Sequence, residues 1–181
     1  MSSSDDEVPG FRLRSGDPFA VAPEDRDPGR RLRGRLASPV TVWTAGRGAQ
    51  RAGLTVSSLV VAEGEPPSVV GLVGPLTNFW EVASATTRFV VHVLDEDQGR
   101  LADRFAGRYP EPPFDRVEAT EGDWGPELAE APTRAFCSVA SYEEVGWFLQ
   151  VTATVDRVDV ATGRPPLVHL QGRYWRLQPG R

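Results

Sequence analysis

Three short β-type segments follow one another between residues 40 and 73 with no room for a helix between them. They are Val40–Ala45, Gly53–Ala62 and Ser68–Val73, each rich in apolar and β-branched residues and flanked by Gly, Pro or charged residues. Parallel strands need a crossover of a dozen or more residues. The spacing therefore disfavours a parallel βαβ sheet and predicts antiparallel pairing. The sequence also lacks a Gly-x-Gly-x-x-Gly helix opening and a Walker-type Gly-Lys-Ser/Thr.

Later parts of the chain continue the β pattern. The further predicted strands or strand pairs are Phe89–Leu94, Arg134–Tyr142, Trp147–Val160 and Pro166–Leu177. Residues 110–132 are rich in Pro, Gly and Glu and are predicted to be a loop. We therefore expect a mainly β fold, a closed barrel with helices at its periphery. Because Ser68–Val73 is almost wholly apolar, we expect this strand to be covered on both faces.

Two segments have helical rather than strand periodicity. In Thr77–Thr87 the apolar residues recur at spacings that bury one helix face, and Thr77 is a natural N-cap. In Asp97–Tyr109 the apolar positions again form one stripe. We expect two or three short helices in all, the third being the Arg-rich stretch from Asp25 to Arg35. That stretch is predicted to be a solvated helix or turn, with a nucleic-acid arm as the alternative.

The length and charge limit the domain organisation and the partners. The 181 residues are predicted to form a flexible tail over residues 1–16 and a single domain over 17–181. A net charge of −5 argues against nucleic-acid binding. No apolar run is long enough to span a bilayer and the first residues do not resemble a secretory signal, so we expect a cytoplasmic protein without membrane contact.

All 20 basic side chains apart from the two histidines are arginines. Without lysine there is no amine nucleophile, and a phosphate must be held by arginine, hydroxyl or backbone groups. Cys137 is the only cysteine, which excludes a disulfide framework and a Cys-rich zinc site; we predict a small buried side chain. Two isolated histidines without carboxylates at ligand spacing predict no metal site.

The segment from Gly53 to Ser58 is the strongest candidate for a ligand site. It places the hydroxyls of Thr55, Ser57 and Ser58 and several backbone N–H groups within six residues. Such a set suits a phosphate that needs no metal. The alternative is that Ser57 and Ser58 are ordinary strand and turn residues, and that Thr77 is only a helix cap.

An ordered set of segments resembles the flavin reductase-like, FMN-binding split β-barrel proteins. The resemblance covers roughly Arg35 to Leu177. Its segments are Ser38–Thr44, Ala52–Ser58, the Glu65–Pro67 turn, Phe89–Leu94, Gln98 with Leu101–Ala102 and Phe105–Ala106, Cys137, Pro166–His169 and Gly172–Tyr174. The resemblance implies a Greek-key-like split barrel and a homodimer with the flavin at or near the subunit interface.

The resemblance also implies positions for the flavin. Residues at the isoalloxazine ring or ribityl chain would be Thr41, Val42, Trp43 and Thr44, with backbone N–H groups at the pyrimidine edge. Residues at the ribityl chain and phosphate would be Thr55, Val56, Ser57, Ser58, Thr77 and Asn78, the last two at a helix N-terminus that favours an anion. Arg51 or Arg88 would add a cation. The implied cofactor is FMN, with FAD as the alternative, and NADH or NADPH is the co-substrate.

Two positions depart from the family pattern. Trp147 stands where many members have a Gly-Asp-His histidine; an indole can stack on flavin or nicotinamide but cannot donate a proton as an acid. His92 stands where Asn is usual, and is either a substitute for its hydrogen bonds or a strand histidine satisfied by its neighbours. His169 is a second candidate neighbour of the rings. No catalytic residue is assigned beyond these two candidates, Trp147 and His169.

The sequence thus predicts an NAD(P)H:flavin oxidoreductase that transfers hydride to flavin and supplies reduced flavin to a monooxygenase component. The alternative is a non-catalytic protein of the same fold that binds FMN, another flavin or a tetrapyrrole. A third interpretation is a dimeric barrel without a ligand. Trp147 favours the second interpretation, because it replaces the histidine of the family pattern. The first interpretation stays open, because the cofactors supply the hydride transfer and no protein acid is needed.

Overall fold

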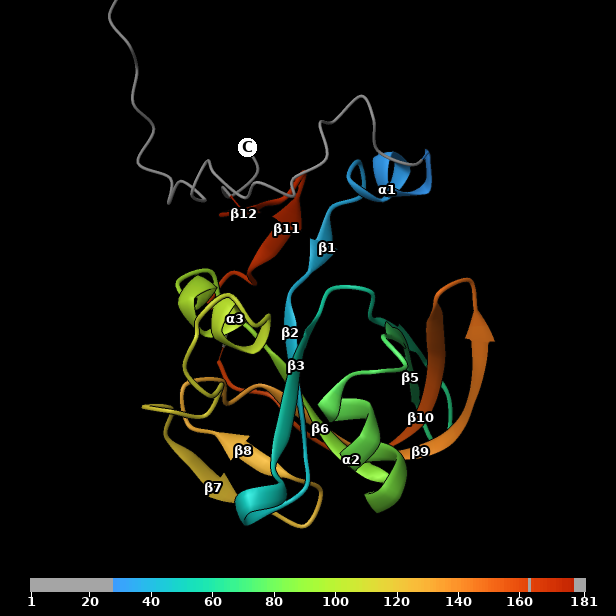
Figure 1. Cartoon of the computed structure of the whole chain (residues 1–181), viewed down its shortest axis with the longest axis vertical. Helices are drawn as coiled ribbons and strands as arrows, with labels where there is room; N and C mark the ends of the chain where they lie inside the picture. Colours follow the sequence, from blue (N-terminus) through green and yellow to red (C-terminus); the bar gives the residue numbers. More distant parts are fainter. Residues whose placement is uncertain (1–27, 163, 178–181) are drawn as a thin grey trace, which may run out of the picture.

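The computed structural model describes residues 28–162 and 164–177, so the predicted tail over residues 1–16 lies outside the described residues. Its main element is a seven-stranded antiparallel sheet in the order β3-β2-β6-β9-β10-β5-β4 (Figure 1). The strands are β2 (Thr41–Ala45), β3 (Ala52–Val56), β4 (Val60–Ala62), β5 (Ser68–Val73), β6 (Arg88–Val93), β9 (Arg134–Val145) and β10 (Phe148–Asp159). The mainly β split-barrel prediction is confirmed.

The sheet curls strongly because its two edge strands are consecutive in the chain. Only residues 57–59 link β3 at one edge to β4 at the other. Six strand spacings in a flat sheet would separate the edges by about 29 Å, whereas four residue steps span at most about 14 Å. The edges must therefore approach each other. They do not pair, however, so the closed-barrel expectation is wrong: the described strands form an open, split barrel.

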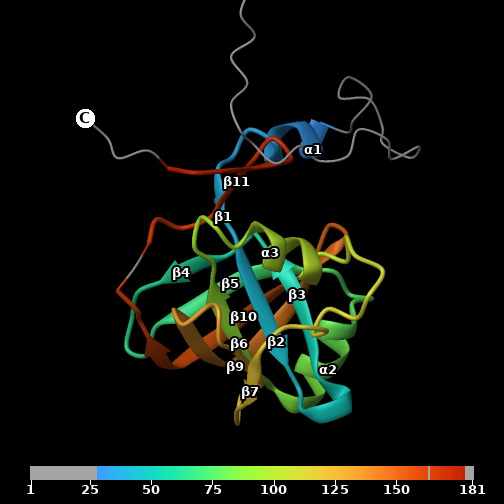
Figure 2. The ribbon, with the colours of Figure 1, turned by 90° about the vertical axis from the view of Figure 1, so that its left-hand side faces the viewer.

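A small second sheet lies at one end of the barrel (Figure 1, Figure 2). It contains β1 (Ser38–Pro39), β11 (Val168–Leu170) and β12 (Arg173–Trp175). The exposed helix α1 (Pro28–Arg33) precedes it, in agreement with the predicted solvated helix. A third, two-stranded sheet is the hairpin of β7 (Ala119–Glu121) and β8 (Pro126–Leu128). This hairpin lies in residues 110–132, so the prediction of a continuous loop there was wrong.

Both other helices begin close to where the sequence predicts. Helix α2 (Asn78–Thr86) follows β5, and its Trp80 backbone N–H donates to the Thr77 hydroxyl at 3.3 Å, which confirms the N-cap. Helix α3 (Gly99–Phe105) buries Leu101, Ala102 and Phe105. The two helices and β3 lie side by side in Figure 2.

The barrel interior is filled by aromatic side chains. The indole of Trp43, fully buried, stacks on Phe89 with a centroid separation of 4.8 Å and meets Phe79 of α2 edge to face at 5.9 Å. On the opposite wall, a Cβ at Gly71 would lie 2.6 Å from the Trp43 Cη2 atom. Only glycine fits at this position of β5.

A second apolar cluster packs on the outer face of β2. Val40 and Val42 contact Leu101, Phe105 and Phe114 there, so every residue of β2 is buried. By contrast, burial alternates along β5, and the side chains of Val70 and Leu72 are only half-buried. The expectation that β5 is covered on both faces was wrong, because both helices and the β7–β8 hairpin pack on other strands.

Candidate functional site

The predicted ring-binding residues of β2 lie inside the barrel wall. The Thr41 hydroxyl donates to the Val56 carbonyl at 2.6 Å and accepts from the Trp43 indole N–H at 3.0 Å. The side chains of Val42, Trp43 and Thr44 are fully buried as well. Strand β2 is also paired on both edges, with β3 and β6. Within this chain, its side chains therefore form part of the barrel wall and offer no exposed surface that a ligand could contact.

Thr44 belongs to a buried polar group on the outer side of the wall. Its hydroxyl lies 2.6 Å from the Pro126 carbonyl and 3.2 Å from His92 Nε2. The other His92 nitrogen, Nδ1, lies 3.2 Å from the Ala131 carbonyl. Burial lowers the pKa of His92 to about 4. This histidine is satisfied by its neighbours, as one of the two sequence interpretations expected.

Residues of the second strand separate into two groups. Thr55 faces α3, where its hydroxyl donates to the Ala102 carbonyl at 2.6 Å, and Val56 is buried in the barrel. Ser57 is half-buried and Ser58 is exposed at the point where the chain leaves β3 for β4. The Ser58 hydroxyl lies 3.0 Å from both the N–H and the carbonyl oxygen of Leu72 in β5.

Helix α2 begins beside this turn. The Thr77 hydroxyl donates to the Gly74 carbonyl at 2.8 Å, two residues beyond Leu72. Ser58 bonds to Leu72 of β5 and Thr77 bonds to Gly74, just beyond that strand. We refer to Ser57, Ser58, Thr77 and Asn78, which are these two residues and their neighbours in the chain, as the hydroxyl site. Among the described residues, the Ser57 hydroxyl and the Asn78 side chain have no hydrogen-bond partner. These two groups, and the first N–H groups of α2, are the donors available to an anion.

A cavity of about 550 Å³ adjoins the hydroxyl site at Asn78. It lies between α2, the β2–β3 connection and the β7–β8 hairpin, and its charged lining residues are Arg47, Arg51, Glu81 and Asp123. Arg47 pairs with Asp123, and the Arg51 guanidinium carbon lies 4.8 Å from the centre of the Phe114 ring. Arg88, the other predicted cation, lies over Trp124 at 5.3 Å instead. Sequence reasoning missed Asp123 and Trp124, because residues 110–132 lack strand composition. It also missed Arg47, whose pairing with Asp123 depends on that hairpin.

The two candidate ring neighbours lie at different places. Trp147 is 83% exposed in the two-residue turn of the β9–β10 hairpin, after Gly146 at φ 59°. His169 is half-buried in β11, where its ring meets Tyr174 edge to face at 6.0 Å. Burial, and then the charges of Arg108 and Arg33, lower the pKa of His169. Within one chain, no contact joins either residue to the hydroxyl site among the described residues.

A reactive cysteine, a metal site and a membrane span are not supported by the described residues. Cys137 is fully buried in β9, and burial raises the pKa of its thiol to about 12, so it behaves as a small apolar side chain. The described residues contain no cluster of three or more His, Cys, Asp or Glu side chains that could hold a metal ion. None of the helices in the described part of the chain is both long and apolar enough to cross a membrane.

Comparison with known proteins places this fold in one family. The family described as "Flavin reductase like domain" matches residues 33–178. The reductase component of a 4-nitrophenol 4-monooxygenase/4-nitrocatechol 2-monooxygenase from Rhodococcus opacus is 30% identical over 89% of this chain and 86% of its own length. The NADH:FMN oxidoreductase of Rhodococcus erythropolis is 30% identical over 80% of this chain and 78% of its own.

Solved structures agree. The NADH:FAD oxidoreductase of Streptomyces globisporus C-1027 superimposes with a TM-score of 0.77 at 29% identity, covering 88% of this chain and 98% of that one. The family match over residues 33–178 includes the strands of both the split barrel and the terminal sheet. The chain therefore belongs to the flavin reductase-like family and is a flavin reductase domain.

Proposed function

We propose that this protein oxidises NADH and reduces a flavin, FMN or FAD, which it supplies to a monooxygenase component. The observation that carries the flavin assignment is the hydroxyl site, in which two polar side chains have no hydrogen-bond partner among the described residues. These are Ser57, which follows β3, and Asn78, the first residue of the nine-residue helix α2. Family membership and the printed names of the relatives support the reaction and the nicotinamide. A cytoplasmic location accords with that role.

The residues present fit a flavin phosphate. Ser57 and Asn78 are neutral donors, and the helix end favours negative charge. The cavity at Asn78 is also lined by Arg51 and by Arg47, which pairs with Asp123, together with Glu81. Ser58 and Thr77 hold the β3–β4 and β5–α2 turns in place, since their hydroxyls already bond to Leu72 and Gly74. When bound, flavin and nicotinamide supply the hydride chemistry. The chain's own residues would bind and orient the two cofactors, and Thr41–Thr44 would form the barrel wall next to them.

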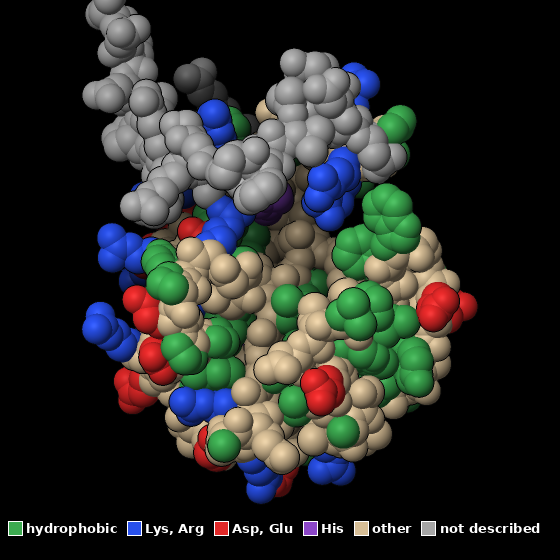
Figure 3. Space-filling view, viewed as in Figure 1, with side chains coloured by type: hydrophobic (Ala, Val, Ile, Leu, Met, Phe, Trp, Pro, Cys, Tyr) green, Lys and Arg blue, Asp and Glu red, His purple; other side chains and the backbone are tan. Residues whose placement is uncertain are grey.

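We further propose that the functional form is a homodimer. Large apolar side chains are exposed on one side of the barrel: Val60 and Val61 of β4, and Tyr142, Val145, Trp147 and Phe148 of the β9–β10 hairpin. Figure 3 shows apolar side chains gathered on the side that carries this hairpin. Large exposed apolar side chains that gather on one side of a protein are typical of an association surface. In a dimer the hairpin would bring Trp147 towards the partner subunit's flavin, which explains an indole placed 83% in solvent.

One experiment tests the reductase assignment. The purified protein is mixed with FMN or FAD and with NADH or NADPH, and nicotinamide oxidation is followed at its absorbance band. We expect flavin-dependent NADH oxidation, faster than that of NADPH. Oxidation that does not depend on added or bound flavin would contradict the proposal, as would absence of both turnover and flavin binding.

The alternative function, a flavin carrier without turnover, is favoured by one observation only. Trp147 cannot act as an acid or carry positive charge beside a reduced flavin. Flavin binding without nicotinamide oxidation would support the carrier and would exclude the reductase.

A further inference from the structure

Three arginines line a second cavity, of about 370 Å³, beside α3. Arg100 and Arg104 come from α3, and Arg116 comes from the loop that follows it, as does Tyr109. Glu130 is the single acidic residue among the described residues that line this cavity. The cavity therefore has excess positive charge in a chain whose net charge is −5.

Arg104 has an unused donor in this cavity. Its Nη1 atom is buried and has no hydrogen-bond partner among the described residues. Its guanidinium carbon lies 5.3 Å from the centre of the Tyr109 ring, which fixes the orientation of the group. Buried donors in folded proteins are nearly always paired. An unpaired guanidinium N–H at the wall of a cavity indicates that an acceptor binds there.

The neighbouring charges make the same point. Arg100 and Arg104 are four residues apart on one helix face, an arrangement in which like charges repel. In the described part of the chain neither forms an ion pair, and Arg116 forms none either. Arg108, just beyond the helix, pairs instead with buried Asp103 at 3.4 Å. Arg108 thus has an acidic partner, whereas the arginines of the cavity form no ion pair among the described residues. A bound anion would neutralise their positive charge.

Arg116 is held by a turn with unusual backbone geometry. Its φ of 58° is in the left-handed region that few non-glycine residues adopt. The turn is fixed by a bond from the Val117 N–H to the Phe114 carbonyl at 3.2 Å, and by burial of the Phe114 side chain. Such conformations persist where surrounding packing imposes them, often at ligand sites. Here it places Arg116 opposite α3.

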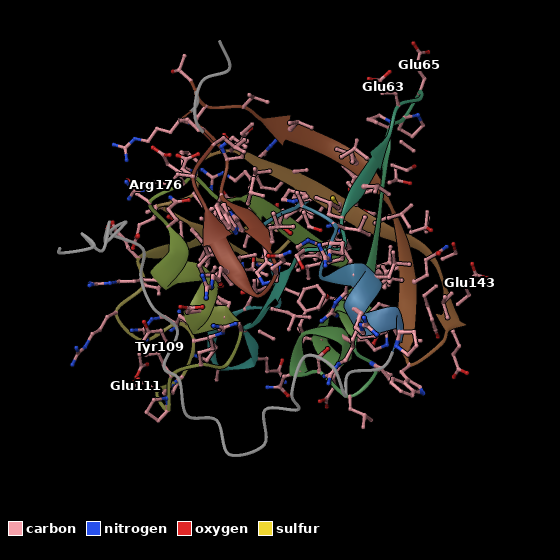
Figure 4. The ribbon with its side chains drawn as sticks, turned by 90° about the horizontal axis from the view of Figure 1, so that it is seen from above. Glu63, Glu65, Tyr109, Glu111, Glu143 and Arg176 are labelled. Carbon is pink, nitrogen blue, oxygen red and sulfur yellow. The ribbon has the colours of Figure 1, made fainter. Side chains whose placement is uncertain are left out.

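We propose that this cavity, the α3 arginine site, binds a phosphoryl-bearing anion such as pyrophosphate or a mononucleotide phosphate. Guanidinium groups offer paired N–H donors that match phosphate oxygens. The site is separate from the hydroxyl site: the cavity beside α3 and the cavity at Asn78 share no lining residue. Figure 4 shows Tyr109 on the side of the molecule opposite Glu143 of the β9–β10 hairpin.

Isothermal titration calorimetry with sodium pyrophosphate and with 5′-AMP tests the proposal. The wild-type chain is expected to bind at least one of the two ligands. The Arg104→Gln variant is expected to bind that ligand at least about tenfold more weakly. Arg100→Gln and Arg116→Gln are expected to weaken binding by about threefold or more. Arg31→Gln on exposed α1 removes the same charge elsewhere and is the matched control. Thermal unfolding without ligand verifies that each variant is folded.

The outcomes distinguish the ligand sources. Equal binding of pyrophosphate and AMP indicates recognition of the phosphoryl group alone, whereas tighter AMP binding indicates a nucleotide. No binding by the wild-type chain, or equal binding by wild type and a folded Arg100→Gln/Arg104→Gln double variant, overturns the proposal. FMN affinity is measured on the same variants and is expected to be unchanged. A parallel loss of FMN affinity would place these arginines in the flavin site and would also overturn it.

Discussion

The Ser58 side chain continues the backbone ladder between β4 and β5 opposite Leu72. Val60 pairs with Val70 and Val61 with Val69, so the same register sets Ser58 against Leu72. At that point the main chain has turned towards β3, so the Ser58 hydroxyl makes the bonds that a backbone partner would make. It donates to the Leu72 carbonyl and accepts from the Leu72 N–H. One side chain thereby fastens the link between the two edges of the split barrel.

Replacing Ser58 should therefore affect stability first. Ser58→Ala removes both bonds to Leu72 and is expected to lower the free energy of unfolding by about 1–2 kcal/mol. Urea unfolding followed by tryptophan fluorescence measures the change. Ser57→Ala is the matched control, because its hydroxyl has no partner among the described residues. Equal stability of the two variants would contradict this role for Ser58.

Replacing Ser57 should affect phosphate recognition instead. If Ser57 donates to the flavin phosphate, Ser57→Ala weakens FMN binding by about tenfold. Riboflavin, which lacks the phosphate, should bind the variant as it binds the wild type. Fluorescence quenching titrations with both flavins provide the comparison. A similar loss for FMN and riboflavin would remove Ser57 from the phosphate site.

His92 should make stability depend on pH. Its pKa falls from 6.5 to about 4 on folding, so the unfolded chain binds more protons between these values. The contribution of neutral His92 is complete above pH 6.5 and is lost as pH falls towards 4, amounting to about 3 kcal/mol. Unfolding free energies at several pH values measure this slope. His92→Asn should flatten it in this window, and an unchanged slope would disprove the assignment.

Trp147 should contribute to subunit association and not to the fold of one subunit. Trp147→Ala removes the exposed tryptophan of the proposed interface. The dissociation constant of the variant dimer is expected to exceed that of the wild type by about tenfold or more. Sedimentation velocity at several protein concentrations gives that constant. Val160→Ala, at a site 77% exposed on a different part of the surface, is the control. A wild-type chain that sediments as a monomer would refute the dimer itself.

Local sequence patterns were enough to predict most of the elements. The strand predicted at Ser68–Val73 has those bounds in the structure, and Thr77 caps the predicted helix. The β7–β8 hairpin was missed because each strand has three residues, and Pro126 in β8 breaks strand composition. Its stability comes from packing, with the side chain of Leu128 buried on the outer face of β2 and β6.

The same hairpin explains why the site was only partly predictable. Polar Thr41 and Thr44 in β2 are typical of a strand that is partly exposed to solvent. This strand is covered in the fold by α3 and by Pro126, more than fifty residues further along the chain. Local pattern cannot reveal such distant cover. By contrast, the places of Ser57 at a strand end and of Asn78 at a helix start could be predicted, because strand ends and helix starts are local features.

The contact between Trp43 and Gly71 has a consequence for how this protein evolves new ligand preferences. One indole fills the width between β2 and β5, and the glycine opposite leaves no spare volume. The interior of this barrel is consequently filled by side chains, unlike that of barrels that enclose their ligands. Selection for a different flavin must therefore act on turns, helix ends and subunit contacts, and can do so without disturbing the core.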